Sequence, residues 1–375
     1  MKIGMVCYPS YGGSGVVATE LGKQLARRGH EVHFITYERP FKLAKFYENV
    51  FFHEVEEIHY PVFKYTPYTL SLANKIVSVS RHADLDLIHV HYAMPHSISA
   101  FLAKQMLSER KLPVVTTLHG TDITLVGAQD DFYDITRLGI KMSDGVTAVS
   151  KDLTRETREI FQTGQEIKTI YNFIDPEEYR RLRLPELRNR LARPEEKILI
   201  HISNFRPVKR ICDVLKTFRL VQEQIPAKLI LIGDGPEASN MEKCLDEWEL
   251  RDKVLFLGKQ ENVVELLSVS DLLLLPSEKE SFGLAALEAM ACEVPVIASA
   301  TGGIPEVVNH GRVGYLVPVG DVENMAARAL EILTTPGLQD KMAGEARKTA
   351  LEKFHVDLII PQYENYYLKV MQSVS

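Results

Sequence analysis

The sequence predicts an α/β protein with two doubly wound parallel sheets. Short, continuously apolar segments such as residues 197–203 and 271–277 recur along the chain, and segments with helical spacing separate them. Strands of this kind are buried on both faces, as in parallel sheets covered by helices. The pattern restarts near residue 197, and 375 residues are long for one core. We therefore expect two Rossmann-like domains that face a cleft, with ligands at the carboxyl ends of the strands.

The first half of the chain opens with a strand–helix–strand unit. An apolar strand at residues 2–8 leads into a glycine loop, and a helical segment at 16–28 ends at Gly29 before a second strand at 31–36. Further strands are expected at 85–92, 113–120 and 144–150, with a helical segment at 97–111 between the first two. These elements predict the first parallel sheet.

The second half repeats this organisation after a connection around residues 167–179. Its expected strands are 197–203, 227–235, 254–258, 271–277 and 295–299, with a helical segment at 213–224. Polar motifs follow several of these strands directly. Because the carboxyl ends of parallel strands meet at one edge of a sheet, we expect those motifs to share a site.

Composition and charge exclude several functional classes. A net charge of −6 argues against nucleic acid as a general partner. Four cysteines without a C-x-x-C pair predict free thiols, and no apolar stretch of about 18 residues is present to cross a membrane, so a cytoplasmic protein is expected. His89 and His91 share a strand face but lack a third ligand at suitable spacing, so we expect no metal and no cofactor. A homo-oligomer is compatible with the sequence.

The glycine loop admits three interpretations. Gly13, Gly15 and Ala18 fit the dinucleotide pattern G-x-G-x-x-A, with Glu38 about twenty residues further on, which would suit an NAD-dependent oxidoreductase. However, Tyr8, Pro9, Ser10, Tyr11 and Gly12 precede the first glycine of that pattern, whereas in the dinucleotide motif this glycine closes the strand directly. Small residues at a helix start also suit an anion or a sugar hydroxyl, and a purely structural turn is the third alternative.

Charged and polar residues follow two other strands. His119 ends an apolar strand and precedes Gly120 and Asp122, so it either lines the cleft or belongs to a turn that caps a helix. Arg206 and Lys209 leave the strand at 197–203. A forked guanidinium and a mobile ammonium are suited to a pyrophosphate.

Two carboxylates lie on either side of a predicted helix start. Glu280 is in the loop after the strand at 271–277, and Glu288 lies one turn into the following helix. The unpaired amides near Leu284 and Ala285 favour an anion, whereas carboxylates accept hydrogen bonds from hydroxyls. The order ribose, diphosphate and sugar in a nucleotide sugar fits this arrangement. A glycosidase acid pair is the alternative, but a loop glutamate and a helix glutamate are poorly placed for it.

The motifs resemble those of a known family. E-x7-E with SFG-x-x-x-LEAMA, GGIPE, GDGPE from Gly233 and LHG-x-D at His119 are similar to the retaining nucleotide-sugar glycosyltransferases of family four, which have the GT-B fold. The resemblance implies a metal-independent enzyme with a donor-binding domain at 171–357 and an acceptor-binding domain at 1–170 joined by the C-terminal helix 358–375. It implies that Glu288 binds the ribose. The implied catalytic residues are His119, Glu280, Arg206 and Lys209, and the other implied donor contacts are Gly13, Gly15, Ser281, Phe282, Gly283, Leu284 and Ala285.

Departures from the usual family pattern indicate one branch. The segment SNFRPVKR keeps Lys209 in place but shifts the usual arginine, for which Arg206 is the expected substitute, and Phe173 replaces a usual glycine. These variants resemble the members that transfer N-acetylglucosamine from UDP-GlcNAc to the hydroxyl of L-malate, which opens bacillithiol biosynthesis. The expected acceptor contacts are Ser14, Lys42, Tyr92, Thr116 and Arg137. Another donor or acceptor, a nucleotide-sugar epimerase and a non-catalytic sugar-nucleotide-binding protein remain alternatives.

Overall fold

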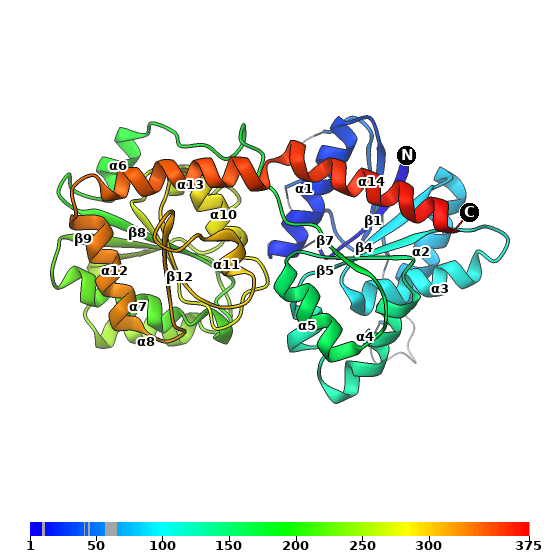
Figure 1. Ribbon diagram of the computed structural model, residues 1–375, viewed down its shortest axis with the longest axis horizontal. Coiled ribbons are helices and arrows are strands. Elements are labelled where there is room, and N and C mark those ends of the chain that lie inside the picture. The colour runs from blue at the N-terminus through cyan, green and yellow to red at the C-terminus, as the bar shows by residue number, and fades with distance from the viewer. Residues whose placement is uncertain (10–11, 41, 44–45, 57–65, 375) are drawn as a thin grey trace. The chain divides into compact units, whose positions relative to one another are not determined.

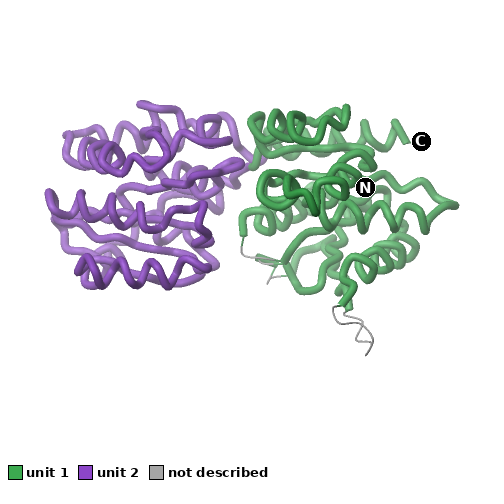
Figure 2. Tube along the Cα trace, turned by 90° about the horizontal axis from the view of Figure 1, so that it is seen from below, with its two compact units in different colours: residues 1–172, 357–375 green, residues 173–356 purple. Residues whose placement is uncertain are grey.

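The chain folds into two compact units. The structure, a computed structural model, describes residues 1–9, 12–40, 42–43, 46–56 and 66–374. Unit 1 contains residues 1–172 and 357–375, and unit 2 contains residues 173–356 (Figure 2). Each unit has its own parallel sheet with helices on both faces (Figure 1). The predicted class, two parallel-sheet α/β domains, is confirmed.

Unit 1 is built on a seven-stranded sheet in the order β3-β2-β1-β4-β5-β6-β7, and its strands pair in parallel. The strands are β1 Lys2–Val6, β2 Glu31–Thr36, β3 Val50–Glu54, β4 Leu87–His91, β5 Val114–Leu118, β6 Gly145–Ala148 and β7 Ile167–Thr169. The helices are α1 Gly13–Arg27, α2 Tyr68–Ala83, α3 Ile98–Met106, α4 Asp130–Met142, α5 Lys151–Phe161 and α14 Val356–Val374, with short helical turns η1 Ala93–Ser97 and η2 Thr121–Leu125.

Alternation along β4 divides its side chains between the two faces of the sheet. Ile88 and Val90 pack with residues of α2 and α3 in one apolar cluster. His89 points the other way, and its Nδ1 lies 2.7 Å from the hydroxyl of Tyr367 in α14. The hydroxyl of Tyr366 also accepts a hydrogen bond from the Val146 amide at 2.9 Å. These buried contacts join the C-terminal helix to unit 1.

Unit 2 has a six-stranded parallel sheet in the order β10-β9-β8-β11-β12-β13. The strands are β8 Lys197–Ile202, β9 Ala227–Ile232, β10 Val254–Phe256, β11 Leu272–Leu275, β12 Val296–Ser299 and β13 Gly314–Val317. The helices are α6 Pro185–Leu191, α7 Ile211–Gln222, α8 Ala238–Glu247, α9 Val264–Ser268, α10 Leu284–Ala291, α11 Ile304–Val307, α12 Val322–Thr334 and α13 Leu338–Phe354, with turns η3 Pro207–Lys209 and η4 Arg251–Lys253.

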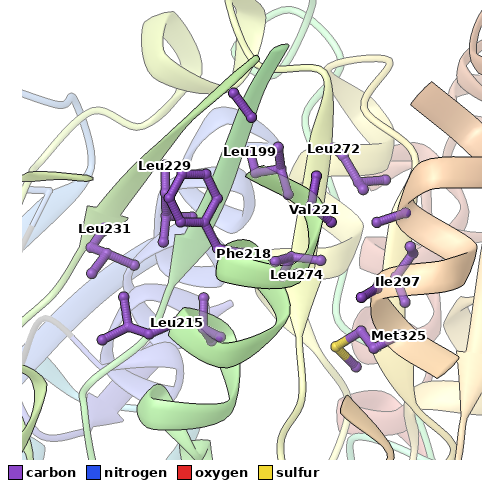
Figure 3. Packing of buried hydrophobic residues seen from close by; sticks show 14 of the residues in the cluster. Leu199, Leu215, Phe218, Val221, Leu229, Leu231, Leu272, Leu274, Ile297 and Met325 are labelled. Carbon is purple, nitrogen blue, oxygen red and sulfur yellow. The ribbon is translucent and has the colours of Figure 1, made fainter. Parts of the chain in front are cut away.

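One large apolar cluster lies between the sheet of unit 2 and helices α7, α8 and α12. The ring of Phe218 from α7 packs among leucines of the strands, including Leu199 and Leu229, and Met325 of α12 belongs to the same cluster (Figure 3). Each of these side chains is at most 2% exposed. Burial of one such side chain contributes about 1.5–3 kcal/mol to the stability of the fold. The cluster therefore fixes the strands of unit 2, and with them the loops at their carboxyl ends.

The strand order reverses once in each sheet. The reversal lies between β1 and β4 in unit 1 and between β8 and β11 in unit 2. In open α/β sheets, ligands bind beyond the carboxyl ends of the strands at this point. A ligand site is therefore expected in the loops after β8, β11 and β12 of unit 2 and in the loops after β1, β4 and β5 of unit 1.

Candidate active site

Three loops at the carboxyl edge of the unit 2 sheet are hydrogen-bonded to one another. The Glu278 amide, after β11, donates to the Val208 carbonyl, after β8, at 2.8 Å. After β12, Thr301 Oγ1 donates to the Glu278 carbonyl at 2.9 Å, and the Gly303 amide donates to the Glu280 carbonyl at 2.9 Å. The loop that carries Glu280 is therefore fixed from both sides.

The GDGPE segment, after β9, adds a fourth loop to this arrangement. The amide of Glu237 donates to the carbonyl of Phe205 at 2.9 Å. Gly233 has φ +134, and a Cβ at this residue would lie 1.7 Å from the Ser203 carbonyl oxygen. Only glycine permits this approach, so the segment supports the loop that leads to Lys209.

Gly302 permits an equally close approach to the Glu280 loop. Its φ is +54, and an added Cβ would lie 2.0 Å from the Glu280 carbonyl oxygen. We expect Gly302→Ala to destabilise unit 2 by about 1–3 kcal/mol from backbone strain alone. Under the prediction that Glu280 contacts the donor, displacement of Glu280 should also raise the donor KM. Thermal unfolding and donor KM measure the two effects.

Gly311→Ala is the matched control. Gly311 has φ +75, but nothing lies within 4 Å of an added Cβ. This variant should therefore show the backbone strain without a change in donor KM. Equal stability and equal donor KM for Gly302→Ala and Gly311→Ala would contradict a role for the Gly302–Glu280 approach in donor binding.

Lys209 and Glu280 form an ion pair within these loops. Lys209 Nζ lies 2.5 Å from Glu280 Oε2, and Ser277 Oγ donates to the same oxygen at 3.3 Å. Both side chains of the pair are less than a fifth exposed, at 17% and 16%. Arg206, at the start of the same turn, is exposed. The structure thus brings together two of the predicted catalytic residues.

Helix α10 begins directly after this loop. Gly283 precedes its first residue with φ +92, and the first amide bonded within the helix is that of Leu287, which donates to the Gly283 carbonyl at 3.1 Å. The amides of Leu284 and Ala285 are at the positive end of the helix dipole, as an anion requires. Phe282 is buried and packs edge-on against Phe354, with ring centroids 5.6 Å apart, which anchors the turn.

Glu288 is one turn further along α10 and is 9% exposed. Its Oε1 accepts a hydrogen bond from the hydroxyl of Tyr179 at 2.9 Å. Tyr179 was not predicted as a functional residue, because it lies 109 residues earlier in the chain and belongs to no recognisable motif. Only the fold brings this aromatic side chain to the carboxylate.

In unit 1, His119 lies in the loop after β5 and is partly buried. Its Nε2 is 2.8 Å from Nδ1 of His91, and its ring is tilted against that of Tyr92 at a centroid distance of 5.3 Å. Burial, reinforced by His96, lowers the pKa of His119 to about 3. The imidazole is therefore neutral near pH 7 and available for hydrogen bonding to a neutral hydroxyl.

Asp122 fixes the backbone around His119. Its Oδ1 accepts hydrogen bonds from the amides of His119 and Gly120 at 3.1 and 3.0 Å, and its Oδ2 accepts from the Ala93 amide at 2.8 Å. Asp122 thus braces the turn that carries His119, whereas Gly120, which precedes the helical turn η2, provides no side-chain cap. Asp122 also joins the loop after β5 to the loop after β4.

The expected acceptor residues are only partly brought together. Ser14 Oγ lies 2.7 Å from the hydroxyl of Tyr92, so these two form one polar pair. Gly13, Ser14 and Gly15 were expected in a loop before the helix, but they form the first turn of α1. Residues 10–11 of the glycine loop lie outside the described residues.

Thr116, another expected acceptor contact, is not at the carboxyl edge of the sheet. The residue lies in the middle of β5 rather than at its end, and its side chain is fully buried. Its hydroxyl is 2.7 Å from Ser143 Oγ. A buried and paired hydroxyl at the centre of a strand does not reach a ligand at the carboxyl edge, so Thr116 is removed from the set of acceptor contacts.

The two expected acceptor cations lie on different elements of unit 1. Lys42 is in the connection between β2 and β3, with φ +67. Arg137 is exposed on α4, and its Nε donates to the Phe161 carbonyl at the end of α5 at 3.0 Å. Their roles stay predictions.

Two further properties concern metal and membrane binding. Within the described ranges, no group of three or more His, Cys, Asp or Glu side chains could hold a metal ion. Among the helices that the structure describes, none is long and apolar enough to cross a membrane.

Comparison with known proteins defines the class. Two family models match, "Glycosyl transferases group 1" over residues 185–349 and "Glycosyltransferase Family 4" over residues 11–178. The structure is similar to sucrose-phosphate synthase from Thermosynechococcus elongatus, with TM-score 0.82 and 22% identity over 100% of both chains. It is also similar to HepE of Anabaena, with TM-score 0.81 and 22% identity over 97% of this chain and 98% of that chain. These likenesses show the fold, which is GT-B.

The sequence comparison is more specific. The chain is 52% identical over 373 residues to the N-acetyl-alpha-D-glucosaminyl L-malate synthase of Bacillus anthracis, which covers 99% of this chain and 98% of that protein. The chain therefore belongs to the family four GT-B glycosyltransferases. It is an enzyme that transfers a hexosyl group, and the oxidoreductase interpretation of Gly13, Gly15 and Glu38 is wrong.

Proposed function

We propose that the enzyme transfers N-acetylglucosamine from UDP-GlcNAc to the hydroxyl of L-malate with retention of configuration, as the first step of bacillithiol biosynthesis. The observation that carries this proposal is the 52% identity, over nearly the full length of both chains, to the synthase from Bacillus anthracis. The arrangement of charges at the carboxyl edge of unit 2 supports it.

The donor-binding residues of unit 2 have separate roles in this proposal. Glu288 accepts hydrogen bonds from the ribose diol, and Glu280 accepts them from hydroxyls of the sugar. The α10 amides near Leu284 and Ala285 contact the diphosphate, together with Lys209 and Arg206. The Lys209–Glu280 ion pair supports this proposal, because a cation for the diphosphate and a carboxylate for sugar hydroxyls would then be neighbours.

The proposed chemistry depends on stabilising the leaving diphosphate. Charge grows on the diphosphate as the bond to the sugar breaks, and Lys209, Arg206 and the helix amides stabilise that charge. The acceptor oxygen then bonds to the anomeric carbon on the face that the diphosphate leaves, and a phosphate oxygen of the leaving group takes the proton of the acceptor hydroxyl. Attack on that same face retains configuration. His119, neutral near pH 7, contributes a hydrogen bond to the donor sugar.

The acceptor brings two carboxylates and one reacting hydroxyl. We assign hydrogen bonding to the Ser14–Tyr92 pair, whose hydroxyls already lie 2.7 Å apart. Lys42 and Arg137 supply positive charge for the carboxylates. Cations placed for a dicarboxylic acid discriminate against neutral acceptors, because their charge would be left unpaired.

Release of UDP across a grid of donors and acceptors tests the proposal. We expect fast release only with UDP-GlcNAc and L-malate together, and slow release with glycerol or inositol as acceptor. Equal rates with a neutral acceptor would overturn the malate assignment and leave the transferase assignment intact. Conversion of UDP-GlcNAc without any acceptor would instead favour an epimerase.

A further inference from the structure

Glu288 is held by a hydrogen bond inside unit 2. The donor of this bond is Tyr179, which lies in the segment between β7 and α6, whereas Glu288 lies in α10. The Tyr179 hydroxyl and Glu288 Oε1 are 2.9 Å apart, and the two residues are 4% and 9% exposed. A carboxylate only accepts hydrogen bonds, so the hydroxyl must donate and the contact has a fixed direction.

The backbone around Tyr179 is anchored to the same helix. Arg347 of α13 donates to the Tyr179 carbonyl at 2.5 Å and to the Ala291 carbonyl, at the end of α10, at 2.6 Å. Its other terminal nitrogen donates to the Pro176 carbonyl at 3.4 Å. One guanidinium therefore holds the turn that carries Tyr179 against the helix that carries Glu288.

The segment is also fixed on its N-terminal side. The Ile174 amide donates to the Phe354 carbonyl at 2.8 Å, and the Val356 amide donates back to the Ile174 carbonyl at 3.0 Å. The Tyr179 amide closes the turn by donating to the Asp175 carbonyl at 2.9 Å. With its backbone fixed in this way, the Tyr179 ring can hold the carboxylate in one orientation.

We infer that Tyr179 is a positioning residue for donor binding, whose buried hydroxyl orients the Glu288 carboxylate toward the ribose diol of the nucleotide. The inference rests on the proposed role of Glu288. Tyr179 itself does not touch the substrate. Its contribution is to orient Glu288 before the nucleotide arrives, so that binding does not have to order this side chain.

Tyr179→Phe tests this role because it removes only the hydroxyl. We expect the KM for UDP-GlcNAc and the Kd for UDP to rise about tenfold, since a hydrogen bond to a charged group is lost from a preorganised site. The ribose contact is the same in the ground state and the transition state, so kcat should stay within about twofold. The KM for L-malate should not change.

Tyr315→Phe is the matched control in the same unit. The Tyr315 hydroxyl donates to Glu331 Oε1 at 2.6 Å, so the same chemical group is removed from another tyrosine–glutamate pair. Tyr315 is in β13 and Glu331 in α12, away from the loops that carry the proposed site. This variant should keep the wild-type KM for UDP-GlcNAc and the wild-type Kd for UDP.

A double-mutant cycle with Glu288→Ala decides whether Tyr179 acts through Glu288. If it does, adding Tyr179→Phe to Glu288→Ala should weaken UDP binding no further. An unchanged UDP Kd in Tyr179→Phe, or the full additional loss in the double variant, would overturn the inference. Binding measured well below the Tm of each variant separates this effect from loss of folding.

The UDP measurement also separates this inference from the proposed function. UDP carries the ribose and is bound without turnover. If the wild-type enzyme binds UDP but does not glycosylate L-malate, the acceptor proposal fails while the Tyr179 test still gives an answer. If malate is glycosylated and Tyr179→Phe behaves as wild type, only the positioning role fails.

Discussion

Replacing Lys209 with alanine should lower kcat by about two to three orders of magnitude, as removal of one preorganised group that stabilises developing charge does in other enzymes. Lys209 Nζ lies 2.5 Å from Glu280 and is mostly buried, so its charge is little screened by water. Leaving-group charge develops in the transition state, and kcat should therefore fall more than donor affinity. Steady-state kinetics with UDP-GlcNAc, together with the Kd for UDP, separate the two.

Lys216→Ala provides the control for this variant. Lys216 is on α7, its side chain is 52% exposed, and it pairs with Asp213 at 3.5 Å. Lys216→Ala removes one positive charge from unit 2, as Lys209→Ala does, but it should leave kcat unchanged. A near-normal kcat in Lys209→Ala, with the fold intact, would place the phosphate-stabilising group elsewhere.

Acidification should destabilise unit 1 strongly. Burial lowers the pKa of His89 to about 3, lowers the pKa of His96 to about 4, and lowers the pKa of His91 well below its ordinary value. These histidines stay neutral in the folded state, whereas the unfolded chain binds protons below about pH 6.5. Stability is therefore fully present above pH 6.5 and is lost as the pH falls below it.

The expected loss is large compared with the stability of a domain. At pH 5 each of the three histidines costs roughly 2 kcal/mol relative to neutral pH. Asp122 acts in the opposite sense, because burial raises its pKa to about 6 and the folded state takes up its proton first. It offsets only about 1 kcal/mol at pH 5.

Calorimetry at pH 7.5 and pH 5.0 measures this effect as a drop in the Tm of unit 1. His96→Asn should reduce this pH dependence, because it removes one of the buried histidines. A Tm that is the same at both pH values would show that the buried histidines do not carry this linkage.

The sequence was most informative where one segment determines its own structure. Continuous apolar runs such as residues 272–275 identify buried parallel strands, and a glycine followed by an uncharged run identifies the start of α10. Glu280, Glu288 and Lys209 were predicted as site residues because each belongs to a recognisable motif in the segment that follows a strand. Contacts between their loops could also be anticipated, because these loops leave the sheet at the same carboxyl edge.

Contacts between distant segments were not predictable in this way. Tyr179 and Arg347 act on the α10 helix from positions far away in the chain, and neither belongs to a motif that signals this role. Thr116 shows a second limit. Successive residues of a strand face opposite sides, so in the pair Thr116–Thr117 the sequence alone does not reveal where each hydroxyl points: Thr116 pairs with Ser143, and Thr117 with His89.

The most direct measurement is the NMR identification of the products formed from UDP-GlcNAc and L-malate by the purified enzyme. The account predicts one equivalent of UDP for each equivalent of a single N-acetylglucosaminyl malate, with the sugar in the α configuration of the donor. A β-linked product would contradict retention. Free N-acetylglucosamine, or an altered sugar formed without malate, would contradict glycosyl transfer to L-malate itself.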